Sequence, residues 1–162
     1  MQTDEKNKNE QNPDFVDLYR RYSALDNGLK AALRRVETPE DIRDTAILYR
    51  MFHDARPHDR WLRVMFLLPW CEQCKAGWED KTKSFGALLA EAHVNENRLF
   101  QMARAKEPLD LVLLRRLAIQ IKPVLNWEKL GWTLFCWDSK VKREDIVEDY
   151  FYNSSKKAQK GA

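Results

Sequence analysis

The segment from Ser84 to Ile121 constrains the fold of this chain most strongly, because its apolar residues recur with helical spacing in three successive stretches. Asn95 is placed to cap the second stretch, and Pro108 suits the first turn of the third, where a missing amide hydrogen costs little. Arg98 and Arg104 are expected to point outward. The residues expected to be buried are Phe85, Leu88, Leu89 and Ala92 in the first helix, Leu99, Phe100, Met102 and Ala103 in the second, and Leu109, Val112, Leu113, Leu117 and Ile121 in the third.

The remainder of the chain also follows helical patterns and shows no internal repeat. Asn12-Pro13 and Thr38-Pro39 are typical helix starts, and Asn126 is expected to cap a late helix. Only five glycines and six prolines are present, too few to form the many tight turns that a fold of many strands needs. We therefore predict an all-α fold, with further helices near residues 15–25, 29–36, 39–49, 59–70, 127–137 and 141–152.

We expect two small helical-bundle domains, because the helices group on either side of a polar loop. The N-terminal helical domain would span residues 15–83 and the C-terminal helical domain residues 84–155, with a hinge between Cys71 and Lys83. Residues 1–14 are expected to form a flexible leader, and residues 156–162 a flexible tail.

The charge and the composition exclude several classes of protein. The net charge is +3, and the tail residues Lys156, Lys157 and Lys160 alone carry that much, so the body is nearly neutral. Binding to nucleic acid therefore depends on how the charges are distributed. No apolar run reaches the roughly 18 residues that a membrane span needs. The polar N-terminus lacks the apolar core of a signal peptide, which predicts a cytoplasmic protein without a membrane partner.

The sequence WCEQCK around Cys71 and Cys74 resembles a thiol redox site. That chemistry needs a strand feeding the cysteines and more strands after them, but the later segments have helical patterns. One CxxC pair, Cys136 and three scattered histidines do not make a zinc site, and no catalytic triad or phosphate-binding loop is present. We predict a protein that is not an enzyme and needs no cofactor or metal, with redox chemistry as a minor alternative.

Arginine is the residue type most suggestive of function. The pairs Arg20-Arg21, Arg34-Arg35 and Arg115-Arg116 are supplemented by single arginines, namely Arg56, Arg60, Arg63, Arg98 and Arg104. Guanidinium groups bind phosphate oxygens in a bidentate manner, which favours a surface that contacts a nucleic-acid backbone. A solvated helix face with partners inside the chain explains the same pattern, so the residues alone leave both interpretations open.

Several short strings occur together in one order: LDNG (25–28), LRRV (33–36), NENRLFQ (95–101), LLRRL (113–117) and VLNW (124–127), with Arg43, Asp44, Tyr49 and Arg50 between them and EDY near the end. In order and spacing these strings resemble the CasB small-subunit family of the type I-E CRISPR Cascade complex. The resemblance extends from about Tyr19 to Tyr152. It implies an all-helical protein with two small helical domains.

The resemblance also implies a non-catalytic subunit of an RNA-guided surveillance complex that stabilises the guide RNA, the target DNA and the displaced strand. The implied partners are CRISPR RNA, target DNA, the backbone and large subunits of Cascade, and a second copy of the chain. The implied nucleic-acid-binding residues are Arg35, Arg56, Arg98, Arg104 and Arg116, supported by Arg34, Arg115 and Lys142. A purely structural subunit that binds other proteins remains the main alternative.

Overall fold

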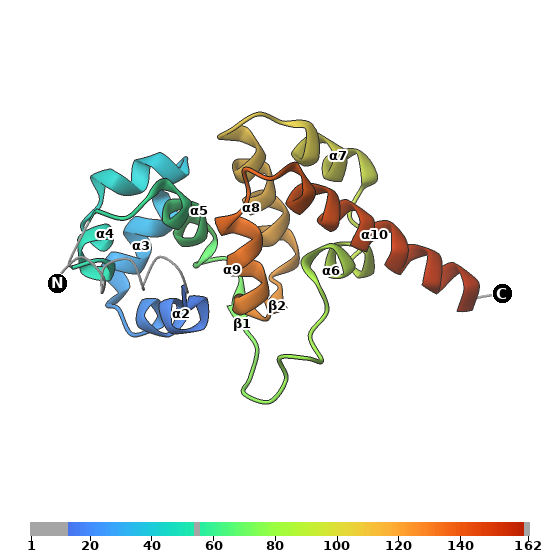
Figure 1. Cartoon of the computed structure of the whole chain (residues 1–162), viewed down its shortest axis with the longest axis horizontal. Helices are drawn as coiled ribbons and strands as arrows, with labels where there is room; N and C mark the ends of the chain where they lie inside the picture. The colour runs from blue at the N-terminus through green and yellow to red at the C-terminus, as the bar shows by residue number, and fades with distance from the viewer. Residues whose placement is uncertain (1–12, 54–55, 161–162) are drawn as a thin grey trace, which may run out of the picture.

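The computed structural model describes residues 13–53 and 56–160, with side chains as far as Asn153. Within these ranges the regular structure is helical apart from two short strands, so the predicted all-α class is confirmed (Figure 1). The elements are α2 (Phe15–Ser23), α3 (Asn27–Arg35), the 3₁₀ helix η1 (Pro39–Asp44), α4 (Ala46–Met51), α5 (Asp59–Leu67), β1 (Glu72–Gln73), α6 (Phe85–Glu91), α7 (Glu96–Arg104), α8 (Leu109–Ile121), β2 (Val124–Leu125), α9 (Trp127–Phe135) and α10 (Lys140–Lys160).

Helices α8 and α9 lie between two groups of helices (Figure 1). Helices α2 to α5 lie on one side, and α6, α7 and α10 lie on the other. Helix α9 packs against α2 and α5, and α8 packs against α5, α6 and α7, so the buried side chains form a single cluster across the expected boundary near residue 83. The division into two domains remains a prediction, and the two groups share one hydrophobic core.

An aromatic cluster joins α2 and α5 to α9. The Phe15 ring lies 5.6 Å from that of Trp61 and 5.8 Å from that of Phe135, measured between centroids. Gly131 of α9 permits this approach, because a Cβ atom at that position would collide with the Phe15 side chain. The Phe15 ring also contacts Trp132 edge-on at 5.4 Å. Pairs of this geometry add to the free energy gained from burial alone.

The structure differs from the sequence prediction at two short strands. Strands β1 and β2 pair in parallel, with Glu72 opposite Val124 and Gln73 opposite Leu125. The Gln73 side chain accepts a 2.7 Å hydrogen bond from the Trp127 amide, and the Trp127 indole donates to the Cys71 carbonyl at 2.9 Å. Runs of two residues are too short to give a strand pattern in the sequence. These contacts fix the CxxC segment against the start of α9.

The buried face of α8 is rotated from the predicted one. Leu109 is 51% exposed and Val112, Leu113 and Ile121 are only partly buried, whereas Leu117 alone of the expected stripe lies in the core. The reason is Asp110, which is fully buried because its carboxylate accepts a 2.7 Å hydrogen bond from the Trp137 indole. The buried face of α8 consists of Asp110, Leu111, Leu114, Leu117 and Ala118.

Several predicted helix starts are confirmed by their hydrogen bonds. The Asn95 side chain accepts from the Asn97 amide at 2.7 Å, and the Asn126 side chain accepts from the Glu128 amide at 3.0 Å. At the first helix Asp14 is the cap, accepting from the Asp17 amide at 2.9 Å, while Asn12 lies outside the described residues.

The expected leader falls mainly on residues 1–12, which lie outside the described part of the chain. At the other end, α10 continues to Lys160, through most of the segment expected to be a tail. Within the described ranges, none of the helices combines the length with the apolar character that a membrane span requires.

Candidate nucleic-acid interface

Arg115 of α8 forms hydrogen bonds with the backbone at the end of α3. Its guanidinium donates hydrogen bonds to the carbonyl oxygens of Val36 and Glu37, and it stacks 4.4 Å from the centroid of the Phe66 ring. Burial, and secondarily the positive charge of Arg116, lower the pKa of Arg115. This geometry explains why an arginine is needed there, since only a planar fork reaches two neighbouring carbonyls while stacking on a ring.

The contact made by Arg115 brings two predicted arginine pairs together. Arg34 and Arg35 form the last turn of α3, immediately before the carbonyls that Arg115 holds, and Arg116 follows Arg115 on α8. Arg34, Arg35 and Arg116 are exposed, and in the described part of the chain no carboxylate lies within ion-pairing distance of them. The Arg115 contact thus brings the end of α3 beside α8, although Arg115 and Val36 are 79 positions apart in sequence.

Helix α7 adds the next two predicted arginines. Arg98 donates to the Gln120 side chain at 3.2 Å, and Arg104 stacks 5.2 Å from the centroid of the Phe100 ring. Gln120 lies one turn beyond Arg116 on α8, so Arg98 and Arg116 approach the same side of that helix. Both α7 arginines are exposed, as expected from the sequence. We call the group of Arg34, Arg35, Arg98, Arg104, Arg115 and Arg116 the arginine strip.

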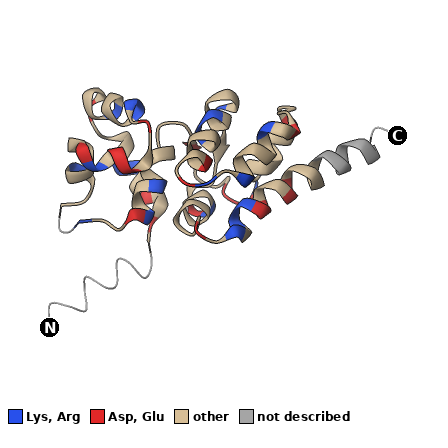
Figure 2. Cartoon of the chain, turned by 90° about the horizontal axis from the view of Figure 1, so that it is seen from above, with Lys and Arg blue, Asp and Glu red and all other residues tan. Residues whose placement is uncertain are grey.

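The structure places Arg56 and Lys142 on other elements. Arg56 is exposed in the loop before α5. The hydrogen bond from Arg43 is the main cause that lowers the pKa of Asp59, and the charge of Arg56 makes a smaller contribution in the same direction. Lys142 lies in the first turn of α10, in a small hollow that Lys129 and Asp145 also line. Figure 2 shows basic and acidic residues interspersed along the chain, which agrees with a nearly neutral body. Both residues remain predictions as nucleic-acid contacts.

The comparisons with known proteins agree with the geometry. A family model described as CRISPR-associated protein Cse2 matches residues 29–151. The chain belongs to the Cse2 family. It is 33% identical over 156 residues to the CRISPR system Cascade subunit CasB of Escherichia coli K12, covering 90% of this chain and 97% of that protein.

A solved structure supports the same assignment. One chain of the crystal structure of E. coli Cascade bound to a PAM-containing double-stranded DNA target is similar to this chain with a TM-score of 0.77 and 33% sequence identity. The match covers 86% of this chain and 97% of the other. The family resemblance deduced from short sequence strings is therefore confirmed.

Other arginines of this Cse2-family chain are used inside the fold. Arg63 is only 4% exposed and binds both carboxylate oxygens of Asp138 at 2.9 Å. Arg143 donates to the Ala105 carbonyl at 3.1 Å and lies 3.6 Å from the buried Asp110 carboxylate. The sequence interpretation named Arg63 among the single arginines and did not assign it an internal partner. Its position inside an apolar run was the available signal, because a buried arginine requires a partner.

The cysteines lie in surroundings unsuited to thiolate chemistry. Burial raises the pKa of the Cys71 thiol far above its ordinary value, and burial followed by the Glu79 charge raises the pKa of Cys74. A reactive thiol needs the opposite change, which positive charge or a helix N-terminus provides. In the ranges that the structure describes, no three histidine, cysteine or acidic side chains gather as metal ligands.

Proposed function

We propose that this chain is the non-catalytic small subunit of a type I-E CRISPR surveillance complex and that its arginine strip binds the sugar-phosphate backbones of the guide–target duplex and the displaced strand. One observation carries this proposal. Five exposed arginines on three helices lack a carboxylate partner among the described side chains, and a sixth, Arg115, holds two of those helices together. Its relative CasB is named as a subunit of Cascade.

Such a strip would favour the exchange of a DNA duplex for an RNA–DNA duplex, whose two sides are nearly equal in free energy. Opening a DNA duplex to form an RNA–DNA duplex changes the free energy little, so contacts to backbone phosphates can decide the outcome. Arginines on helices supply these contacts without reading the base sequence, which the guide RNA does. A nearly neutral body adds no long-range attraction, so the strip acts best when the other subunits hold it beside the strands.

The partners follow from the same proposal. They are CRISPR RNA and target DNA on the arginine strip, the backbone and large subunits around it, and a second copy of this chain. Arg56 would add a separate phosphate contact in the loop before α5, and Lys142 another in the first turn of α10. The crystal structure that contains the similar chain shows E. coli Cascade bound to a double-stranded DNA target, which supports nucleic acid as a partner.

A purely structural subunit is the second candidate, favoured by the balanced surface charge and by exposed apolar side chains such as Val141. Reversing the charge of arginines in the strip distinguishes the nucleic-acid-binding subunit from the purely structural one. The variant Arg35→Glu/Arg104→Glu/Arg116→Glu is expected to assemble with the other subunits but to retain target DNA about tenfold less well at physiological salt, because three phosphate contacts are lost.

The matched control is Lys75→Glu/Lys81→Glu/Lys129→Glu, which changes the net charge equally at exposed lysines on the 75–83 loop and α9. Assembly is measured by size-exclusion chromatography, and DNA retention by a gel shift of the assembled complex. If the arginine variant and the control retained DNA equally well, the structural subunit would be the better account.

A further inference from the structure

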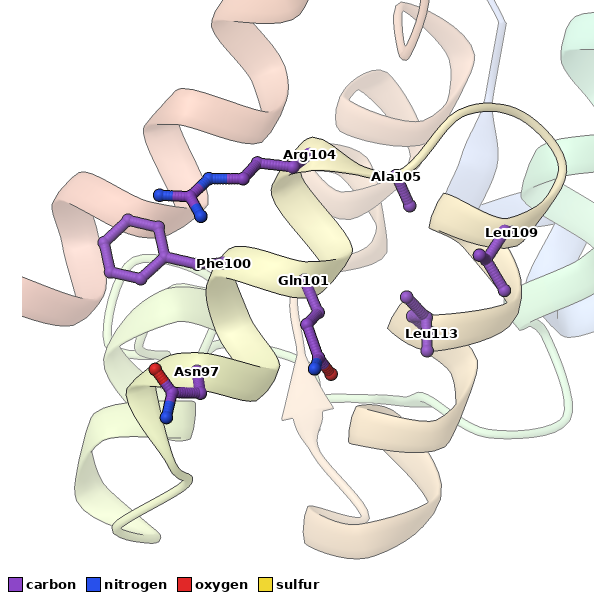
Figure 3. Close-up of a pocket in the computed structure, with 7 residues that line it drawn as sticks. All are labelled: Asn97, Phe100, Gln101, Arg104, Ala105, Leu109 and Leu113. Carbon is purple, nitrogen blue, oxygen red and sulfur yellow. The ribbon is translucent and has the colours of Figure 1, made fainter.

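A shallow hollow lies between α7 and α8, beside the arginine strip. Its volume is about 700 Å³, and it is open to solvent on one side. Figure 3 shows Leu109 and Leu113 on the α8 side of the hollow and Gln101 projecting between the helices, while Asn97, Phe100 and Arg104 extend from α7 away from α8 along its rim. Leu109 is 51% exposed, an unusual position for leucine at the start of a long helix.

The side chains of the hollow match the two kinds of surface that a nucleobase presents. Asn97 and Gln101 are exposed amides, and each offers both hydrogen-bond donors and an acceptor to the edge of a base. Leu109 and Leu113 offer apolar surface to the face of a base or to a sugar. The Arg104 guanidinium already lies on the Phe100 ring, and bases of unpaired strands stack on such guanidinium planes.

Arginines lie at both ends of the hollow. Arg104 is in the last turn of α7, near the start of α8, and Arg98 is in the first turn of α7, where it contacts Gln120 near the end of α8. Arg116 approaches the same end one turn away. Between Arg98 and Arg104 the helix rises about 9 Å. This rise separates their backbone positions, and the long side chains of both arginines can reach the phosphates on either side of one nucleotide.

We propose that the hollow binds one unpaired nucleotide of a single strand, with its base against Asn97, Gln101 and Leu109 and its flanking phosphates on Arg104 and on the Arg98–Arg116 end. This site deepens the proposed function and rests on it. A base that is paired within a duplex cannot enter, because its edge and both faces are already occupied. The arginine strip therefore supplies salt-dependent affinity, and the hollow supplies a preference for strands whose bases are free.

The test compares two single-stranded oligomers with equal phosphates, oligothymidylate and a fully abasic oligomer of the same length, by fluorescence anisotropy with the purified chain. The wild-type chain is expected to bind the oligomer with bases at least about fivefold more tightly, the lower end of the effect of one stacked base. In Asn97→Ala/Gln101→Ala, whose charge and helix propensity are unharmed, this ratio is expected to fall toward one. Asn27→Ala, an exposed amide at the start of α3, is the matched control.

The outcomes separate this site from the proposed function. In Arg34→Glu/Arg35→Glu, which leaves the arginines beside the hollow unchanged, both oligomers are expected to bind more weakly by a similar factor. Equal affinity of the wild-type chain for the two oligomers would overturn the nucleotide site and leave the arginine strip intact, as would an unchanged ratio in Asn97→Ala/Gln101→Ala. Absence of binding to either oligomer, even at low salt, would overturn the proposed function and the nucleotide site together.

Discussion

Replacing Asp138 with alanine is expected to lower the free energy of unfolding by about 3 kcal/mol, because the substitution leaves Arg63 buried without a counter-charge. Arg63 comes from α5 and Asp138 lies between α9 and α10, so their two hydrogen bonds tie α5 to the segment that connects those two helices. The loss is expected at the lower end of the range for a broken buried pair, because the Asp138 side chain is itself 64% exposed. Urea denaturation measures the loss, with Asp80→Ala, at an exposed loop position, as the control.

The same pair predicts a dependence on pH. Hydrogen bonds from Arg63 hold the pKa of Asp138 below its ordinary value of 3.8. A carboxylate with a lowered pKa stabilises the fold above its unfolded pKa, and this stability is lost as the pH falls through the folded pKa. The difference between the wild-type chain and Asp138→Ala is therefore expected to be full above about pH 5 and to shrink below about pH 4. A difference that stayed constant down to pH 2 would contradict the assignment.

Replacing Arg115 with methionine is expected to lower the free energy of unfolding by about 2 kcal/mol and also to weaken binding to nucleic acid. Methionine retains an apolar stem against Phe66 but cannot donate to the carbonyls of Val36 and Glu37. The end of α3 would then be held less firmly, and Arg34 and Arg35 would be less well placed beside Arg116. Denaturation and anisotropy measure the two effects.

Arg115→Lys distinguishes position from charge. Lysine keeps the positive charge but loses the planar fork, so it is expected to restore less than half of the lost stability. If Arg115 contributed only its charge to the surface, the lysine variant would bind nucleic acid as the wild-type chain does, and the methionine variant would be as stable as the wild-type chain. That pair of results would show that Arg115 does not position α3.

Helical periodicity and capping residues were enough to predict the fold class. Asn95 and Asn126 identified helix starts because their hydrogen bonds are made to backbone amides only two residues away. The buried face of α8 could not be predicted in the same way. It depends on a hydrogen bond between Asp110 and Trp137, which are 27 residues apart. Helical spacing in the sequence does not predict contacts between such distant residues.

In the candidate site, too, some features could be predicted from local sequence pattern and others could not. Arg34, Arg35, Arg98, Arg104 and Arg116 are exposed as expected, since each lies on the polar side of an amphipathic helix. The internal role of Arg63 was missed, and so was that of Arg115 at α3. Their partners, Asp138 and the Val36 carbonyl, are 75 and 79 residues away, and one of them is a backbone atom without any sequence signature. The parts of the site that depend on local pattern were predictable, and the contacts that join distant segments were not.

The salt dependence of binding tests the central claim most directly. The logarithm of the association constant for duplex DNA is measured against the logarithm of the salt concentration for the wild-type chain, for Arg35→Gln/Arg104→Gln/Arg116→Gln, and for the control Lys75→Gln/Lys81→Gln/Lys129→Gln. If the arginine strip binds phosphates, the arginine variant loses about 0.9 from the steepness of the slope for each contact removed, and the lysine variant keeps the wild-type slope. Identical slopes for all three proteins would contradict the claim that these arginines bind the nucleic-acid backbone.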